Sequence, residues 1–198
     1  MSSYVDKGFF IKILFSMFLS LLFGLDLFGI NYKVDSQHSY VGFQVRYILA
    51  SHVKGKFLQY AGIFSFDEDT KQLSWLIGTI DVSSINTNND ARDTHLLSED
   101  FFDIKTYPYM NFVLLGANAQ IAKIKVTIKD VTRVIDMKIK DVKMYRTKSG
   151  KKVISFTIKA ALSRKKFHIN FNPLLDAGGL LISDTIRLNI KLKGIEDN

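Results

Sequence analysis

The chain has 198 residues, of which 47% are apolar, enough to bury the core of one domain. It contains no cysteine, which excludes disulfide bonds and thiolate chemistry. The net charge is +8, and residues 121–166 hold fifteen lysines or arginines against three aspartates. Such a field favours anionic partners such as lipid head groups, and a solubilising outer surface is the alternative interpretation.

The first thirty residues have the composition of a targeting segment. Residues 9–25 are apolar at all but four positions, and Lys7 and Lys12 lie at their front. The stretch without a charged residue, 13–25, is short for a membrane span of ~20 residues and fits the core of a signal peptide. We therefore expect residues 1–30 to export the chain, with an uncleaved N-terminal anchor in the inner membrane as the alternative, and residues 31–198 to form one domain.

Most of that domain alternates between apolar and polar residues, as half-buried β-strands do. The pattern recurs, separated by turn residues, in segments 40–47, 73–82, 109–115, 122–129, 135–139, 154–162 and 180–193. Gly55 and Gly62 interrupt the aromatic stretch 51–66 and indicate bends of the kind that barrels need. The last segment alternates most regularly, and Asp184 is the one polar residue in its apolar row.

Segment 86–103 differs from the rest and contains the one helix that we expect. Asn88, Asn89 or Asp90 can cap it, and residues 91–97 provide two helical turns. We expect this helical insertion, near residues 89–103, to cover one end of the sheet.

About eight strands with short turns and no βαβ rhythm predict a mainly β fold with antiparallel pairing. Such a sheet must close on itself or stack on a second sheet, and we expect a closed eight-stranded barrel. A barrel of this size holds either its own side chains or one small ligand, and periodicity does not choose between them.

Several short motifs stand out along the domain. They include V-K-G-K-F at 53–57, I-N-T-N-N-D-A-R-D-T-H-L at 85–96, T-I-K-D-V-T at 127–132 and F-H-I-N-F-N at 167–172. Taken together and in this order, over roughly residues 31–194, they resemble the motifs of the YceI-like polyisoprenoid-binding family of exported bacterial proteins. In the third motif, Asp130 stands in place of the glycine that is usual in the family's turn.

The resemblance implies a lipocalin-like barrel in the periplasm, often a homodimer, that encloses a polyisoprenoid or a similar amphiphile. A quinone, a quinone precursor and a fatty-acid derivative are the other ligands considered, and no further cofactor and no nucleic acid are expected. The apolar residues expected to line the tunnel are Val41, Phe43, Val45, Phe64, Ile80, Phe112, Leu114, Ile154, Phe156, Ile158, Leu188 and Ile190.

Two basic residues, Arg46 and Lys54, are candidates for binding a head group at the mouth of the tunnel, and plain surface charge is the alternative.

Arg92, Asp93 and His95 suggest a catalytic cluster, but no serine lies in a glycine elbow, so we expect them to hold the helix in place. The histidines lack the paired spacing of a zinc site, so neither a metal nor a catalytic residue is predicted. Two other functions stay open: an exported stress or surface-binding protein with a filled core, and an enzyme acting on an isoprenoid lipid.

Overall fold

The computed structural model describes residues 30–47, 51–173 and 181–197. The expected signal segment lies outside these residues, apart from Ile30. The described strands are β1 (Ile30–Val34), β2 (Tyr40–Tyr47), β3 (Ser51–Phe57), β4 (Tyr60–Asp67), β5 (Gln72–Asp81), β6 (Ile85–Asn86), β7 (Tyr109–Ala117), β8 (Ile121–Ile128), β9 (Val131–Arg146), β10 (Lys152–Ser163) and β11 (Ile182–Glu196). The helices are α2 (Asp90–Leu97) and the 3₁₀ turns η2 (Val82–Ser84) and η3 (Lys165–Phe167).

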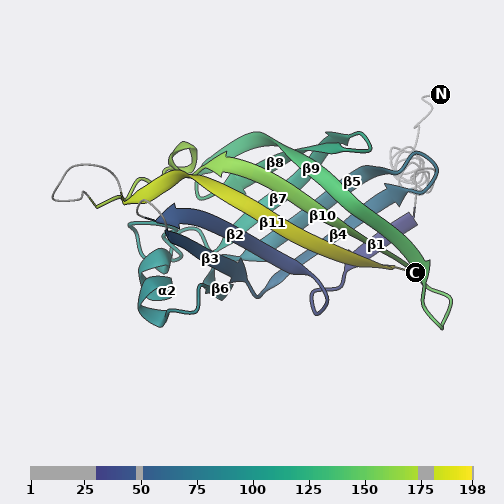
Figure 1. Ribbon diagram of the computed structural model, residues 1–198, viewed down its shortest axis with the longest axis horizontal. Coiled ribbons are helices and arrows are strands. Elements are labelled where there is room, and N and C mark those ends of the chain that lie inside the picture. The colour runs from purple at the N-terminus through teal and green to yellow at the C-terminus, as the bar shows by residue number, and fades with distance from the viewer. Residues whose placement is uncertain (1–29, 48–50, 174–180, 198) are drawn as a thin grey trace, which may run out of the picture.

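The strands close into the predicted antiparallel barrel (Figure 1). Eight strands form the ring in the order β1-β4-β5-β7-β8-β9-β10-β11, and β11 pairs with β1 to complete it. β11 pairs with β2 from Ile182 to Lys191 and with β1 from Gly194 to Glu196. Because β2 pairs in turn with β3, and β3 with β6, these strands extend the wall beyond the ring at one end.

Alternating side chains separate the barrel's inside from its outside, as the sequence predicts. In β8, Ile124 and Val126 are buried while Lys123 and Lys125 are exposed. The pattern slips where β9 passes Asp141, because Ser155 pairs with Lys143 while Thr157 pairs with Lys140. This bulge, with Asp141 at φ 56°, accounts for the loss of alternation in the sequence around Asp141.

One end of the barrel is filled by aromatic side chains. The rings of Tyr32 and Phe64 stack with centroids 5.4 Å apart, and Phe156 meets Phe64 edge-on at the same distance. Gly194 makes room for them, since a Cβ atom there would lie 2.4 Å from the Phe64 ring. The interior therefore contains an ordinary packed core at this end.

The single helix of the described residues lies at the other end. The side chain of Asn89 caps α2 by accepting a hydrogen bond from the Arg92 amide at 2.9 Å. The Asp93 carboxylate accepts bonds from the amide and the hydroxyl of Thr87, at 3.0 and 2.6 Å. These bonds fix α2 to the chain that leaves β6, which is the structural role expected for Asp93. No helix in the described part of the chain is both long and apolar enough to cross a membrane.

Candidate functional site

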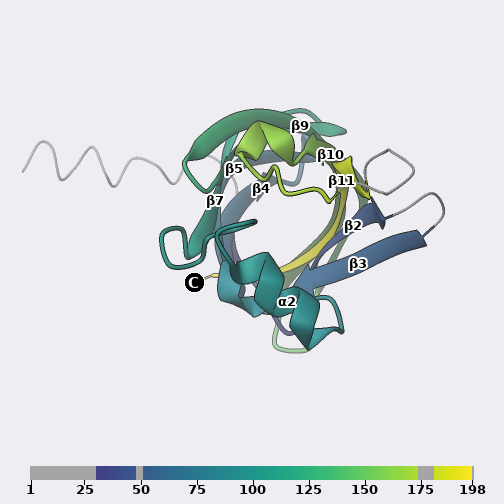
Figure 2. The ribbon, with the colours of Figure 1, turned by 90° about the vertical axis from the view of Figure 1, so that its left-hand side faces the viewer.

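The barrel is hollow at its α2 end. A cavity of about 580 Å³ lies there, and α2 lies at the rim of this end (Figure 2). Small-molecule sites in proteins typically measure ~300–1,000 Å³. The volume is therefore that of a binding site rather than of a packing defect.

Inward side chains of opposite walls form this cavity, and nearly all of them are apolar. Ile186 of β11 pairs with Val45 of β2, and Leu188 pairs with Phe43, so these residues form one continuous wall. The remaining lining residues are Tyr47, Val53, Phe57, Ala91, Arg92, His95, Leu96, Phe101, Phe102, Met110, Ile128, Leu162, Arg164, Phe167, Ile169, Phe171, Pro173 and Ile182.

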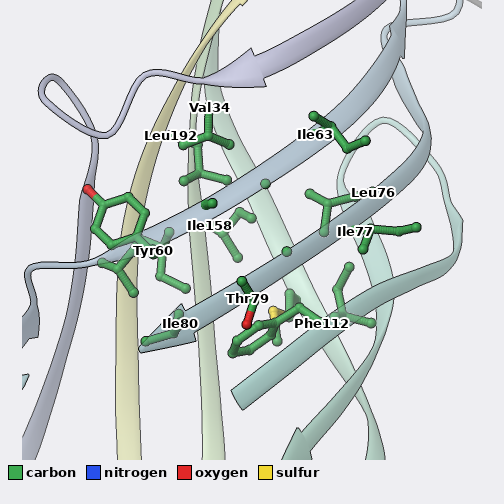
Figure 3. A pocket seen from close by; sticks show the side chains of 17 residues that line it. Val34, Tyr60, Ile63, Leu76, Ile77, Thr79, Ile80, Phe112, Ile158 and Leu192 are labelled. Atoms are coloured by element: carbon green, nitrogen blue, oxygen red, sulfur yellow. The ribbon is translucent and has the colours of Figure 1, made fainter. Parts of the chain in front are cut away.

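A second, smaller cavity of about 70 Å³ lies further along the same strands (Figure 3). Inward positions of β2 and β11 pass from the large cavity to the small one, which Val41 and Ile190 help to line. The small cavity lies where Gly62 of β4 pairs with Gly78 of β5, two positions without side chains. A cavity of about 150 Å³ is needed for a molecule such as benzene, so this void is too small for a chain lipid.

The predicted lining residues fall into three sets along the barrel. Those that line the large cavity are Phe43, Val45 and Leu188. Those that line the small one are Val41, Ile80, Phe112, Ile158 and Ile190. Those that line neither are Phe64, Leu114, Ile154 and Phe156.

The structure corrects the expected positions of the third set. All four residues are buried in the packed core. Phe64 and Phe156 fill the end opposite α2, and Ile154 pairs with Gly194 there. They point inward as the alternation requires, but they line neither of the two cavities described above.

Of the two roles considered for Arg46 and Lys54, their positions favour plain surface charge over contact with a head group. Both side chains are exposed, and neither lines the cavity. They alternate with Val45 and Val53, whose side chains point inward, so they lie on the outside of the wall.

The ionisable residue that the sequence analysis missed is Arg164. Only 3% exposed, it lines the cavity and donates hydrogen bonds to the carbonyls of Ile169 at 2.7 Å and Phe171 at 2.8 Å. It also donates to the carbonyls of Ser183 and Ile182, at 3.1 and 3.3 Å. Burial lowers the pKa of its guanidinium. Arg164 thus joins the loop after β10 to the start of β11.

Asp184 supports the same junction from outside the cavity. Its carboxylate accepts hydrogen bonds from the Ser163 hydroxyl at 2.9 Å and the Lys165 amide at 3.0 Å. Burial would raise the pKa of Asp184, but these bonds outweigh it and hold the pKa below its ordinary value. The polar break in the last strand's apolar row therefore bonds to a loop amide.

Two polar residues of α2 reach the rim of the cavity. Arg92 donates from Nε to the Thr87 hydroxyl at 2.7 Å and from Nη2 to the Thr87 carbonyl at 2.8 Å. His95 bonds through Nε2 to Asp100 at 2.8 Å, and its ring lies edge-on to Phe101 and Phe171. Within the described residues no cluster of three or more histidine, aspartate or glutamate side chains could hold a metal ion.

A closed antiparallel barrel with an apolar hollow under a short helix defines the lipocalin-like class of fold. The chain belongs to the family of the YceI-like domain, whose model matches residues 32–194. A UPF0312 protein of Staphylococcus aureus (strain USA300) is 31% identical over 159 residues, which cover 79% of this chain and 92% of the relative. A UPF0312 protein of Staphylococcus epidermidis (strain RP62A) is 30% identical over 172 residues, covering 85% and 99%.

Solved structures show the same fold. The YCEI protein of Campylobacter jejuni is 31% identical, with a TM-score of 0.64 over 83% of this chain and 96% of that one. BcnA of Burkholderia cenocepacia is 21% identical, with a TM-score of 0.67 over 81% and 98%. A polyisoprenoid binding domain from Saccharophagus degradans is 16% identical, with a TM-score of 0.59 over 85% and 99%.

Proposed function

We propose that this protein binds a long-chain apolar molecule in the cavity at the α2 end and carries it, without catalysing a reaction on it. The observation that carries the proposal is the cavity of about 580 Å³ with its almost wholly apolar lining. One end of this barrel has a packed core and the other end is hollow. Stability alone does not explain the hollow, because empty apolar volume lowers the stability of a fold.

The energetics favour a long tail. Each CH₂ group moved from water into the cavity contributes ~0.8 kcal/mol. Association itself costs ~4–15 kcal/mol, so about ten carbons offset only the lower half of that range. Tight binding therefore needs a longer chain, and no specific hydrogen bond to the tail is required.

Within this class we propose a polyisoprenoid or a related amphiphile, such as a quinone, its precursor or a fatty-acid derivative. The family membership supports this choice, and the Saccharophagus degradans protein of the same fold is described as a polyisoprenoid binding domain.

We also propose that residues 1–30 export the chain to the periplasm. The homodimer expected from the resemblance stays a prediction, which light scattering of the purified protein tests.

An anionic membrane is the partner that the outer surface fits best. Lys159 of β10 pairs with Lys138 of β9, and Thr157 pairs with both Lys140 and Lys191, so these basic side chains share the outside of three strands. Together with Arg187 they define a basic wall, and none of its members forms an ion pair within the described residues. We propose that this wall brings the carrier to acidic lipids, and binding to phosphatidylglycerol vesicles that vanishes with added salt tests it.

Native mass spectrometry tests the carrier function, using protein purified from its own host and then extracted with organic solvent. Val45→Trp fills the cavity from β2, and Gln44→Trp places the same ring outside on the same strand. We expect an extractable lipid on the wild type and on Gln44→Trp, and none on Val45→Trp. A wild-type protein without extractable lipid, or equal loading of both variants, contradicts the proposal and favours a filled-core, surface-binding protein.

A further inference from the structure

We propose that the cavity selects amphiphiles whose head group presents anionic oxygen atoms, a carboxylate or a phosphate, and discriminates against ammonium heads. The inference rests on the proposed function and adds the chemistry of the head group to it. It is carried by the charge of the side chains that line the cavity.

The charged groups that face the cavity are all basic. Two guanidinium groups line it, Arg92 from α2 and Arg164 from the loop after β10. The imidazole of His95, also from α2, lines it as well. No carboxylate from the described residues lines this cavity. In a largely apolar enclosure, where the effective dielectric constant is below that of water, a positive charge attracts an anion more strongly than it does in water.

The acidic groups around these arginines are hydrogen-bonded to other residues, and Asp184 also interacts electrostatically with Arg164. Asp93 is bonded to the amide and hydroxyl of Thr87, and Asp184 to the Lys165 amide and Ser163. Asp100 is bonded to Nε2 of His95 and lies outside the cavity lining. Neither guanidinium forms an ion pair within the described part of the chain.

Arg92 is the group placed to meet the head group. Its Nε and Nη2 atoms donate to Thr87, which holds the planar guanidinium in one orientation, while Nη1 donates to none of the described residues. An arginine held in this way presents a fixed donor to a carboxylate or a phosphate. Arg164, by contrast, uses its donors on four backbone carbonyls and contributes its charge.

The rim beside Arg92 is aromatic. His95 lies edge-on to Phe171 with centroids 4.8 Å apart and to Phe101 at 5.1 Å, and all three line the cavity. An amphiphile with its tail toward Leu188 and its head at Arg92 would thus hold its tail against apolar and aromatic side chains. The lining therefore offers an apolar surface to the tail and a basic side chain to the head group.

Four ligands with the same sixteen-carbon tail test the proposal: hexadecanoic acid, hexadecyl phosphate, hexadecanol and hexadecylamine. Their affinities are measured near neutral pH by displacement of Nile red, a neutral fluorescent probe. We expect the acid and the phosphate to bind at least tenfold more tightly than the amine, with the alcohol between them. The ranking of acid and phosphate identifies which anionic head the site prefers.

Variants of Arg92 locate the effect. Arg92→Gln should lower the acid-to-alcohol affinity ratio several-fold, and Arg92→Lys should restore part of it. Arg46→Gln is the matched control, because it removes an arginine from the outside of the wall and should leave the ratio unchanged. If the Gln variant fails to fold, the wild-type ranking of the four ligands still decides the question.

The same experiment distinguishes failure of the head-group proposal from failure of the carrier function. If all four ligands bind equally well, or the amine binds best, the head-group proposal is overturned and the carrier function stands. If none of the four displaces the probe from a folded protein, the carrier function itself is contradicted.

Discussion

Gly194 shows how a single residue determines where the barrel is filled. A Cβ atom at this position would lie 2.4 Å from Cζ of Phe64 and 2.9 Å from Cβ of Tyr32. Phe64 is fully buried, so its ring has no free space into which it could move. The glycine therefore permits the aromatic packing that closes this end.

Replacing Gly194 with alanine should lower the free energy of unfolding by about 2 kcal/mol, because the added methyl group overpacks a dense core. Gly78→Ala is the matched control, since the nearest atom to its new Cβ would be the Ala61 carbonyl oxygen at 3.5 Å, an ordinary contact. Urea unfolding followed by the fluorescence of Trp75, the one tryptophan of the chain, measures both. Equal losses in the two variants would contradict this account of the filled end.

The buried guanidinium of Arg164 gives a second prediction at this scale. Arg164→Met removes the donor from four backbone carbonyls, and we expect a loss of about 3 kcal/mol in unfolding free energy. Lys165→Met, at the exposed neighbouring position, should change it by less than ~0.5 kcal/mol. Denaturant unfolding checks both values, and a near-neutral Arg164→Met would show that those carbonyls do not depend on it.

The sequence predicts which side chains point into the barrel, but it does not predict how far along the barrel axis each of them lies. Phe43 and Phe64 both occupy inward positions of regular strands, yet one lines the cavity and the other fills the core. The difference depends on partners that are distant in sequence, such as Gly194 beneath Phe64. Arg164 was missed for a related reason, because a basic residue followed by Lys165 and Lys166 looks like an exposed loop until the fold buries it.

Among the elements, α2 controls the hollow end. It was predictable because Asn89 precedes a stretch with helical residues and no alternation, and the structure confirms both cap and helix. Its bonds from Arg92 and Asp93 to Thr87 fix it at the rim of the cavity. The break of segment 51–66 into β3 and β4 at Leu58 and Gln59 was not expected, because each half alternates in the same way.

Removing the cap of α2 should loosen the cover of the cavity. Asn89→Ala leaves the Arg92 amide without its partner and should destabilise the helix by about 1 kcal/mol. Hydrogen exchange of the α2 amides measures this local stability, and the exposed Thr94→Ala serves as the control. Unchanged exchange in Asn89→Ala would contradict the capping role.

At the scale of the whole molecule, two carboxylates predict how stability depends on pH. A hydrogen bond from Lys152 is the main cause of the lowered pKa of Glu68, and loop hydrogen bonds outweigh burial to lower that of Asp184. A carboxylate with a depressed pKa stabilises the fold above its unfolded value of about 4, and this contribution is lost as the pH falls toward the folded pKa.

The melting temperature should therefore change little between pH 7 and pH 5 and fall below about pH 4 as these groups take up protons. Asp184→Asn should reduce the acid sensitivity, because its side chain no longer titrates. Circular dichroism melts over this range provide the measurement. A melting temperature that rises on acidification would contradict the sign derived from these two groups.

The architecture as a whole combines a filled end, a hollow end and a basic wall in one barrel. The filled end supplies the stability of a packed core around Phe64 and Phe156. This allows the α2 end to keep about 580 Å³ free of protein atoms. The account depends on that hollow being the place where an apolar chain is held.

Photolabelling tests the location most directly. A long-chain alcohol with a diazirine at its methyl end is bound to the protein, irradiated, and mapped by mass spectrometry of the resulting peptides. The account predicts labels on inward residues of β2 and β11, such as Val45 and Leu188, which Val45→Trp abolishes. Labels confined to exposed outer residues such as Leu115 and Val134, and unaffected by Val45→Trp, would contradict it.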